Sequence, residues 1–202
     1  TRERGIVLIF DEVVTGFRYA PGGCQEYYGV TPDLTTLAKI LAGGLPGGAV
    51  AGRADILALF ESRDDPQWQR FGRIRHPGTF NANPVSAAAG IACLNVVRSG
   101  EPQKQAIRTA ERLQRAFQEI LDQRGVHGIM SADASILALR LTDGKVSDRE
   151  LTRRLRIALQ VGGVDFDGAS FKVSAVHDEA DVQQTIAAFT QAIELLGKDG
   201  AL

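Results

Sequence analysis

The sequence is short of cysteine, of net charge and of long apolar runs. Of 202 residues only Cys24 and Cys93 are cysteines, and their spacing matches neither a metal site nor a disulfide framework. Two free thiols are typical of a reducing cytoplasm, where we expect the protein to work. The three histidines share no ligand spacing, so no metal site is expected.

The other absences concern partners. No apolar stretch approaches the roughly 20 residues that a membrane-spanning helix requires, so we expect no membrane partner. The formal net charge of -1 does not favour binding to nucleic acid or to acidic membranes. The composition is otherwise that of an ordinary globular protein.

Two apolar segments each end in a charged residue. An Ile- and Val-rich run over residues 5–10 precedes Asp11, and a second strand predicted over 34–41 contains Lys39 just before a glycine-rich turn at 43–48. Such runs are typical of parallel strands that are buried on both faces. Because ligands of open α/β sheets lie at the carboxyl ends of the strands, we expect Asp11 and Lys39 to share one edge.

Each of the two residues has an alternative interpretation. Asp11 could cap a loop or pair with a cation such as Arg18, and Lys39 could extend its amine to water from the sheet edge. As a pair they are more specific, since they are 28 positions apart, about one strand–crossover–strand unit. A lysine among apolar neighbours is a nucleophilic amine, and a pyridine-ring aldehyde cofactor needs such an amine together with a carboxylate.

The rest of the chain divides into two parts near Ser99. We predict an α/β unit over 1–99, with a third strand, a short helix, an irregular polar segment and an alanine-rich helix. The last of these begins at Asn83-Pro84. We predict a small α+β unit over 100–202. Its expected elements are a helix over 102–124 ended by Gly125, strands at 136–141 and 171–176, a turn at Asp143-Gly144, and helices opened by Ser147 and Asp178.

Several motifs together resemble a known family. They are FDEVVTGFR (10–18), TPDLTTLAK (31–39), GGLPGGA (43–49), HPGTF (76–80), Asn83-Pro84 and SAVHD (174–178). These segments resemble class III, fold-type I pyridoxal-phosphate aminotransferases, closest to the glutamate-1-semialdehyde aminomutase branch and to the aminotransferase domains of modular synthetases. The resemblance implies part of a large domain with a mostly parallel sheet, followed by a small α+β C-terminal domain.

The resemblance also implies roles for individual residues. Lys39 would be the Schiff-base lysine that binds pyridoxal 5'-phosphate and moves the substrate proton, and Asp11 would pair with the ring nitrogen. Val13 would pack on one face of the ring. Thr79 would bind the cofactor phosphate, usually that of the neighbouring subunit of a homodimer; without the resemblance it is a plain turn threonine. Arg18 could meet a substrate carboxylate, although a structural ion pair is the simpler interpretation.

The activity implied is transamination between a small-molecule amino donor and a carbonyl acceptor. An intramolecular aminomutase of the glutamate-1-semialdehyde type is an alternative. The family pattern normally extends well upstream of Thr1, so we expect this chain to be a C-terminal half. A further alternative is therefore an inactive fragment that needs the missing N-terminal half, with a sheet edge left exposed.

Overall fold

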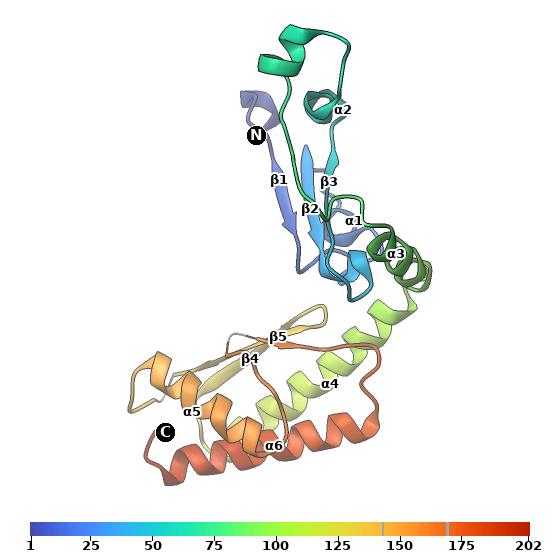
Figure 1. Ribbon diagram of the computed structural model, residues 1–202. Coiled ribbons are helices and arrows are strands. Elements are labelled where there is room, and N and C mark those ends of the chain that lie inside the picture. Colours follow the sequence, from blue (N-terminus) through green and yellow to red (C-terminus); the bar gives the residue numbers. More distant parts are fainter. Residues whose placement is uncertain (143, 169) are drawn as a thin grey trace. The chain divides into compact units, whose positions relative to one another are not determined.

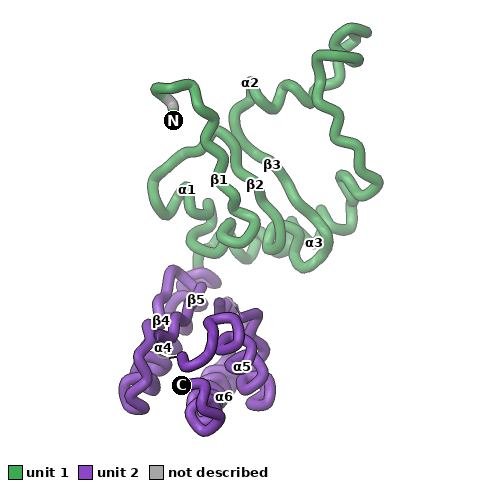
Figure 2. The backbone as a smooth tube through the Cα atoms, turned by 90° about the vertical axis from the view of Figure 1, so that its left-hand side faces the viewer, with its two compact units in different colours: residues 1–100 green, residues 101–202 purple. Residues whose placement is uncertain are grey.

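A computed structural model describes residues 1–142, 144–168 and 170–202, and only the backbone of Arg2. Contacts divide the chain into two compact units, Thr1–Gly100 (unit 1) and Glu101–Leu202 (unit 2), which are coloured separately in Figure 2. Asp143 of the turn predicted at 143–144 lies outside the described residues. No helix in the described part of the chain is both long enough and apolar enough to cross a membrane.

Unit 1 is built on a three-stranded sheet with the order β1-β2-β3 (Figure 1). Strand β1 (Ile9–Glu12) runs parallel to β2 (Leu34–Ala38), and β3 (Gly48–Gly52) runs antiparallel to β2. The third strand confirms the prediction, but the strands described form a mixed sheet, so a mostly parallel sheet is not shown. The short glycine-rich connection between β2 and β3 allows only a reversal, because a parallel return needs a long crossover.

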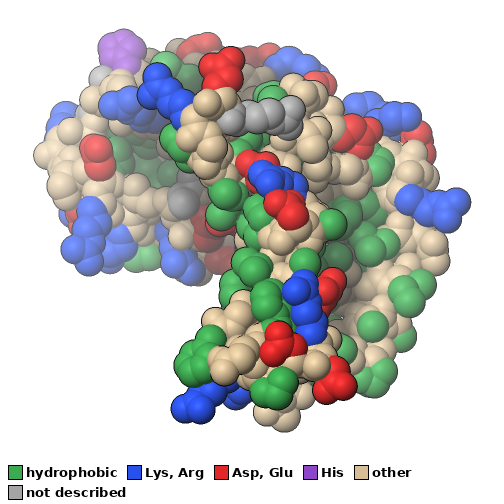
Figure 3. Space-filling view, turned by 90° about the horizontal axis from the view of Figure 1, so that it is seen from above, with side chains coloured by type: hydrophobic (Ala, Val, Ile, Leu, Met, Phe, Trp, Pro, Cys, Tyr) green, Lys and Arg blue, Asp and Glu red, His purple; other side chains and the backbone are tan. Residues whose placement is uncertain are grey.

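Strand β1 differs from its prediction in position and in burial. It begins at Ile9, and it contains Asp11 rather than ending before it. The side chains of Ile6, Val7 and Ile9 are 55%, 46% and 55% exposed, so the expectation of burial on both faces is wrong for this chain. The reason is that no described part of the chain covers these side chains. Figure 3 shows hydrophobic side chains at the molecular surface.

Unit 1 also contains short helical segments before, between and after its strands. These are the 3₁₀ turns Arg2–Arg4, Lys39–Ala42 and Ala58–Phe60, helices α1 (Gly23–Tyr28) and α2 (Ala54–Leu57), and a π-helical turn, Trp68–Gly72. Helix α3 (Pro84–Val97) begins as predicted, because the Asn83 side chain accepts hydrogen bonds from the N–H groups of Val85 and Ser86.

Helix α3 packs closely on the Lys39–Ala42 turn. A Cβ atom at Gly90 would lie 2.5 Å from the carbonyl oxygen of Leu41, and one at Gly43 would lie 2.5 Å from the carbonyl oxygen of Ala89. Only glycine fits at either position without a backbone shift. The alanine-rich helix therefore supports the segment that begins at Lys39.

Unit 2 has an antiparallel sheet with helices on one face (Figure 1). Its elements are α4 (Glu101–Gln123), β4 (Gly128–Asp133), β5 (Ile136–Leu141), α5 (Asp148–Val161), β6 (Phe171–Lys172) and α6 (Glu179–Lys198). Strand β5 and the starts of α5 and α6 confirm their predictions. Strand β4 was not predicted, and β6 covers only the first two residues of its predicted range because β5 pairs with it only there.

The hydrophobic core of the described residues lies in unit 2. Phe117 of α4 and Phe189 of α6 are fully buried, and their rings stack with centroids 4.1 Å apart. Around them the core gathers buried residues of all three helices and of the sheet, among them Leu121, Leu137 and Leu159. This packing makes unit 2 a well-formed α+β core.

Candidate functional site

The Asp11 carboxylate is held through one of its two oxygens. Asp11 lies opposite Thr36 in the β1–β2 register, and the Thr36 hydroxyl donates a hydrogen bond to Asp11 Oδ1 at 3.2 Å. The N–H of Val13 donates to the same oxygen at 3.1 Å. Oδ2 has no hydrogen-bond partner among the described residues. The carboxylate is thus anchored through Oδ1, and Oδ2 remains available to bind a ligand.

Lys39 follows the last residue of β2 and begins the 3₁₀ turn. It lies three positions beyond Thr36, or about 10 Å along a strand. Its φ of 52° is left-handed, which costs a residue with a Cβ about 1–2 kcal/mol. Within the described parts of the chain its amine makes neither a hydrogen bond nor an ion pair. Asp11 and Lys39 therefore lie at the same edge of the sheet, both without an ionic partner.

Both residues are more exposed than the sequence predicted. Lys39 is exposed, and two residues later the Leu41 backbone packs against Gly90 of α3. Asp11 shares its face of the sheet with Ile9 and Val50, which are 55% and 51% exposed. In this chain, the face of the sheet that carries Asp11 is therefore exposed to solvent.

The buried carboxylate at this edge belongs to Glu12, which is 2% exposed. Its Oε2 accepts hydrogen bonds from the N–H of Cys24 at 2.6 Å and from the Thr15 hydroxyl at 3.5 Å, and its Oε1 accepts one from the N–H of Gln25 at 3.3 Å. A Cβ at Gly23, where φ is 76°, would lie 2.3 Å from Oε2. Glu12 thereby fixes the loop that follows β1.

This role of Glu12 was not predicted from the sequence. The available signal was the glycine pair that precedes Cys24, but nothing local connects that pair with an acid ten residues earlier. The loop that Glu12 fixes begins with Val13, so this buried acid also supports the placement of a predicted site residue.

The remaining predicted residues lie in loops of unit 1. Val13 is half-buried beside Asp11, and Thr79 is exposed in a turn closed by a 3.0 Å hydrogen bond from the Asn81 N–H to the Gly78 carbonyl. Burial lowers the pKa of the Arg18 guanidinium below its usual value. An Asp11–Arg18 ion pair, one of the alternatives from the sequence, is not found among the described residues.

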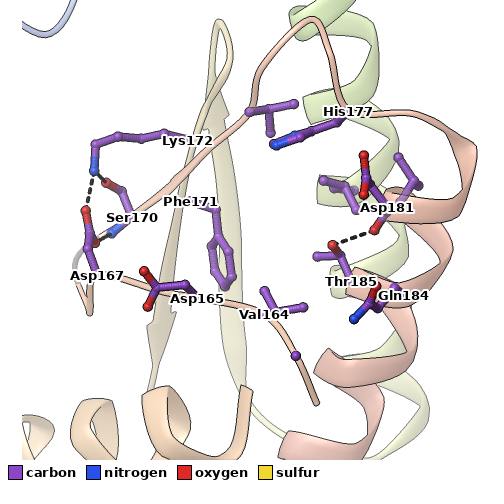
Figure 4. Close-up of a pocket in the computed structure, with 14 residues that line it drawn as sticks. Val164, Asp165, Asp167, Ser170, Phe171, Lys172, His177, Asp181, Gln184 and Thr185 are labelled. Atoms are coloured by element: carbon purple, nitrogen blue, oxygen red, sulfur yellow. Dashed lines mark hydrogen bonds and ion pairs between the residues drawn. The ribbon is translucent and has the colours of Figure 1, made fainter. Parts of the chain in front are cut away.

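Cavities of the described residues lie away from this edge, and one in each unit illustrates this. In unit 1 a cavity of about 870 Å³ is lined by the Leu41–Ala42 backbone, β3, the loop at 76–83 and α3. In unit 2 a cavity of about 350 Å³ is lined by polar and apolar side chains, and among the polar ones Lys172 bonds to Asp167 and Ser170 (Figure 4). Neither is lined by Asp11 or Lys39, so the candidate site is the strand edge itself.

The chain belongs to a known family. The model of the class-III aminotransferases, "Aminotransferase class-III", matches residues 1–192. Glutamate-1-semialdehyde 2,1-aminomutase of Methanopyrus kandleri is 36% identical over 201 residues, which are 94% of this chain and 45% of the relative. The aminomutase of Methanocaldococcus jannaschii is 37% identical over 96% of this chain and 46% of the relative. The chain therefore spans less than half the length of these relatives.

Solved structures of transaminases have a fold similar to that of this chain. An omega-transaminase from Sphaerobacter thermophilus superimposes with a TM-score of 0.84 at 32% identity, over 96% of this chain and 45% of that one. A structure described as a transaminase with PLP bound gives a TM-score of 0.87 at 25% identity, over 100% of this chain and 47% of that one. The α/β fold is thus that of about half of a PLP-dependent transaminase.

Proposed function

We propose that this chain is the catalytic C-terminal half of a pyridoxal-phosphate-dependent enzyme that moves an amino group from a small-molecule donor to a carbonyl acceptor. The observation that carries the proposal is the shared position of Asp11 and Lys39 at one edge of the sheet in a class-III aminotransferase chain. Each of the two groups is the kind that the chemistry requires, and each lacks an ionic partner in the described residues.

The residues present fit pyridoxal phosphate. Asp11 has one oxygen anchored and Oδ2 left for a cationic N–H, which suits a protonated ring nitrogen. When bound, the cofactor supplies an aldehyde for the lysine and a ring that accepts the electrons of the substrate Cα–H bond. In this proposal Lys39 Nζ would hold the cofactor covalently and, once released, would act as the base that removes the proton from the substrate Cα and as the acid that returns it.

The other assignments follow from the family. Val13 packs on one face of the ring, and the Thr79 hydroxyl binds the phosphate, in a homodimer that of the neighbouring subunit. Residues 1–99 form the C-terminal part of the cofactor-binding large domain, and residues 100–202 form the small domain. In this proposal the protein works in the cytoplasm, as its low cysteine content favours.

A second candidate activity is the aminomutase reaction. It is favoured by the two archaeal relatives above, which carry that name. The aminomutase would keep one molecule bound through both half-reactions, whereas an aminotransferase releases a keto product before it binds the acceptor. Incubation of the full-length protein with an amino donor alone separates them, since only the aminotransferase releases one equivalent of keto acid or aldehyde per site.

The third possibility is that this chain alone is inactive and needs the remaining half of the protein. It is supported by the uncovered face of the sheet around Asp11. Comparing the 202-residue chain with the full-length protein in the labelling experiment below tests it, because only the complete protein would then be labelled.

The experiment that tests the proposal is covalent labelling at Lys39. The full-length protein is incubated with pyridoxal phosphate, reduced with borohydride and digested for peptide mass spectrometry. We expect one cofactor-modified peptide, carrying Lys39, and turnover that falls by at least about a hundredfold in Lys39→Ala. Lys104→Ala, an exposed lysine paired with Glu101 on α4, is the control and should label normally. Labelling that persists in Lys39→Ala would refute the assignment.

A further inference from the structure

We propose that Thr36 is a positioning residue that orients the Asp11 carboxylate, so that Oδ2 is the oxygen that meets the ring nitrogen of the cofactor. This inference rests on the proposed function. It adds a residue that the motif resemblance did not assign and a role for each carboxylate oxygen. In this inference Thr36 acts on the cofactor only through Asp11.

The geometry at Asp11 carries the inference. Two donors converge on Oδ1, the Thr36 hydroxyl at 3.2 Å and the Val13 N–H at 3.1 Å. Oδ2 has no partner in the described residues. An aspartate side chain turns about two torsions, and one hydrogen bond from the next loop would leave the other oxygen free to exchange places with the first. A second donor on the neighbouring strand defines which oxygen faces outward.

The backbone and side chain of Thr36 are both conformationally restricted, so its hydroxyl can hold the Asp11 carboxylate in one orientation. It lies on β2, the central strand, with Asp11 of β1 opposite on one side and Val50 of β3 opposite on the other. Both neighbouring strands therefore restrict its backbone. Its β-branched side chain has few rotamers, so the hydroxyl is held in direction as well as in position. Thr35, the preceding residue, points to the opposite face and is 4% exposed.

An oriented carboxylate affects the cofactor through the ring proton. A charge-assisted hydrogen bond is strong only when its distance and angle are maintained. Loss of the Thr36 hydroxyl would leave Asp11 charged but less well aimed, and the protonated ring would be less stabilised. The predicted consequence is weaker cofactor binding together with easier loss of the ring proton.

The test uses the full-length protein and pyridoxal phosphate labelled with ¹⁵N in its ring. Thr36→Val removes the hydroxyl at nearly constant volume, Thr36→Ser restores it, and Thr35→Val is the matched control on the other face. We expect Thr36→Val to bind the cofactor about tenfold more weakly. We also expect its ¹⁵N signal to move toward the unprotonated position at a lower pH than in the parent. Thr36→Ser and Thr35→Val should resemble the parent in both measurements.

The outcomes separate this inference from the proposed function. Absence of any Lys39 adduct in the parent protein would refute the proposed function, and this inference with it. A normal adduct in the parent, with Thr36→Val identical to it in affinity and in the pH dependence of the ¹⁵N signal, would refute the role of Thr36 alone. If Thr36→Val does not fold, as judged by its melting temperature, Thr36→Ala removes the same hydroxyl with a smaller side chain and decides the question by the same two measurements.

Discussion

Units 1 and 2 contain similar numbers of residues but differ in how they use their hydrophobic side chains. Unit 2 gathers the whole of the connected core found in the described residues, around the stacked Phe117–Phe189 pair. Unit 1 holds most of the exposed large hydrophobic side chains, among them Ile9, Val50 and Phe80. The unit that carries the proposed chemistry is therefore the one whose packing is incomplete.

This difference indicates where the rest of the protein is needed. An apolar face that stays open usually marks an interaction surface. The relatives that this chain matches are about twice as long as the part it covers. We infer that unit 2 folds by itself, and that unit 1 reaches its final packing only when the remaining half covers the Asp11 face of the sheet.

The largest expected loss of unfolding free energy comes from Phe189→Ala in the 202-residue chain, and it should far exceed the loss from a comparable change in unit 1. Phe189 is fully buried, so its truncation should cost about 3–5 kcal/mol of unfolding free energy. Ile9→Ala is the control in unit 1, and at 55% exposure it should cost less than about 1 kcal/mol. Urea unfolding followed by far-UV circular dichroism and by the fluorescence of the single tryptophan, Trp68 of unit 1, reports on both units. Equal losses for the two variants would contradict the comparison.

Glycine-to-alanine changes in helices should alter the unfolding free energy less, and the change should have opposite signs in the two units. In Gly90→Ala of α3 the new Cβ meets the Leu41 carbonyl oxygen, so we expect a loss of about 1–3 kcal/mol and weaker labelling of Lys39. In Gly197→Ala of α6 the new Cβ meets nothing within 4 Å, so we expect a gain of about 0.5 kcal/mol. Urea titration of both variants gives the two signs, and a stabilising Gly90→Ala would mean that α3 does not press on the Lys39 turn.

The smallest expected effect is the pH dependence of stability that comes from Glu150 of unit 2. Hydrogen bonds from Arg153 and Arg154 lower the pKa of Glu150 from 4.5 to about 2. Because the folded-state pKa is lowered, the stabilisation from this group is present above about pH 4.5 and is lost as the pH falls toward about 2. The ion pairs are exposed, so the change should be small and should shrink in high salt.

The control for this pH dependence is an exposed acid of α4, Glu119. Unfolding of Glu150→Gln in urea should show a flatter pH profile between pH 4.5 and 2 than the parent, whereas Glu119→Gln should keep the parent profile. The same slope in Glu150→Gln and in the parent would show that the arginine pairs contribute nothing.

Local signals predicted much of the fold. Asn83-Pro84 and Asp178 open helices because each cap side chain accepts hydrogen bonds from N–H groups two or three residues later, and Gly125, with φ of 64°, ends a helix where a left-handed residue is required. Strand β4 was missed because its residues do not alternate clearly. Its pairing with β5 depends on a tight turn at Ala134, where φ is 49°, and alanine gives no sequence signal for that conformation.

For the site, the sequence predicted which residues share an edge but not their surroundings. The positions of Asp11 and Lys39 follow from strand ends, which apolar runs reveal. Their exposure depends on what covers the sheet, and no pattern within the two strands contains that information. The Thr36–Asp11 hydrogen bond depends on the register of two strands 25 residues apart, which the local sequence does not define.

The left-handed backbone of Lys39 has a consequence for evolution and engineering. Glycine or asparagine would adopt that conformation more easily, so the position is held by a residue that is poorer for folding and, in this proposal, indispensable for chemistry. Selection for thermal tolerance alone would be expected to replace it, and a library screened only for solubility or melting temperature would enrich inactive sequences at this position. Any stabilised version of the protein should therefore be sequenced at this codon before its activity is judged.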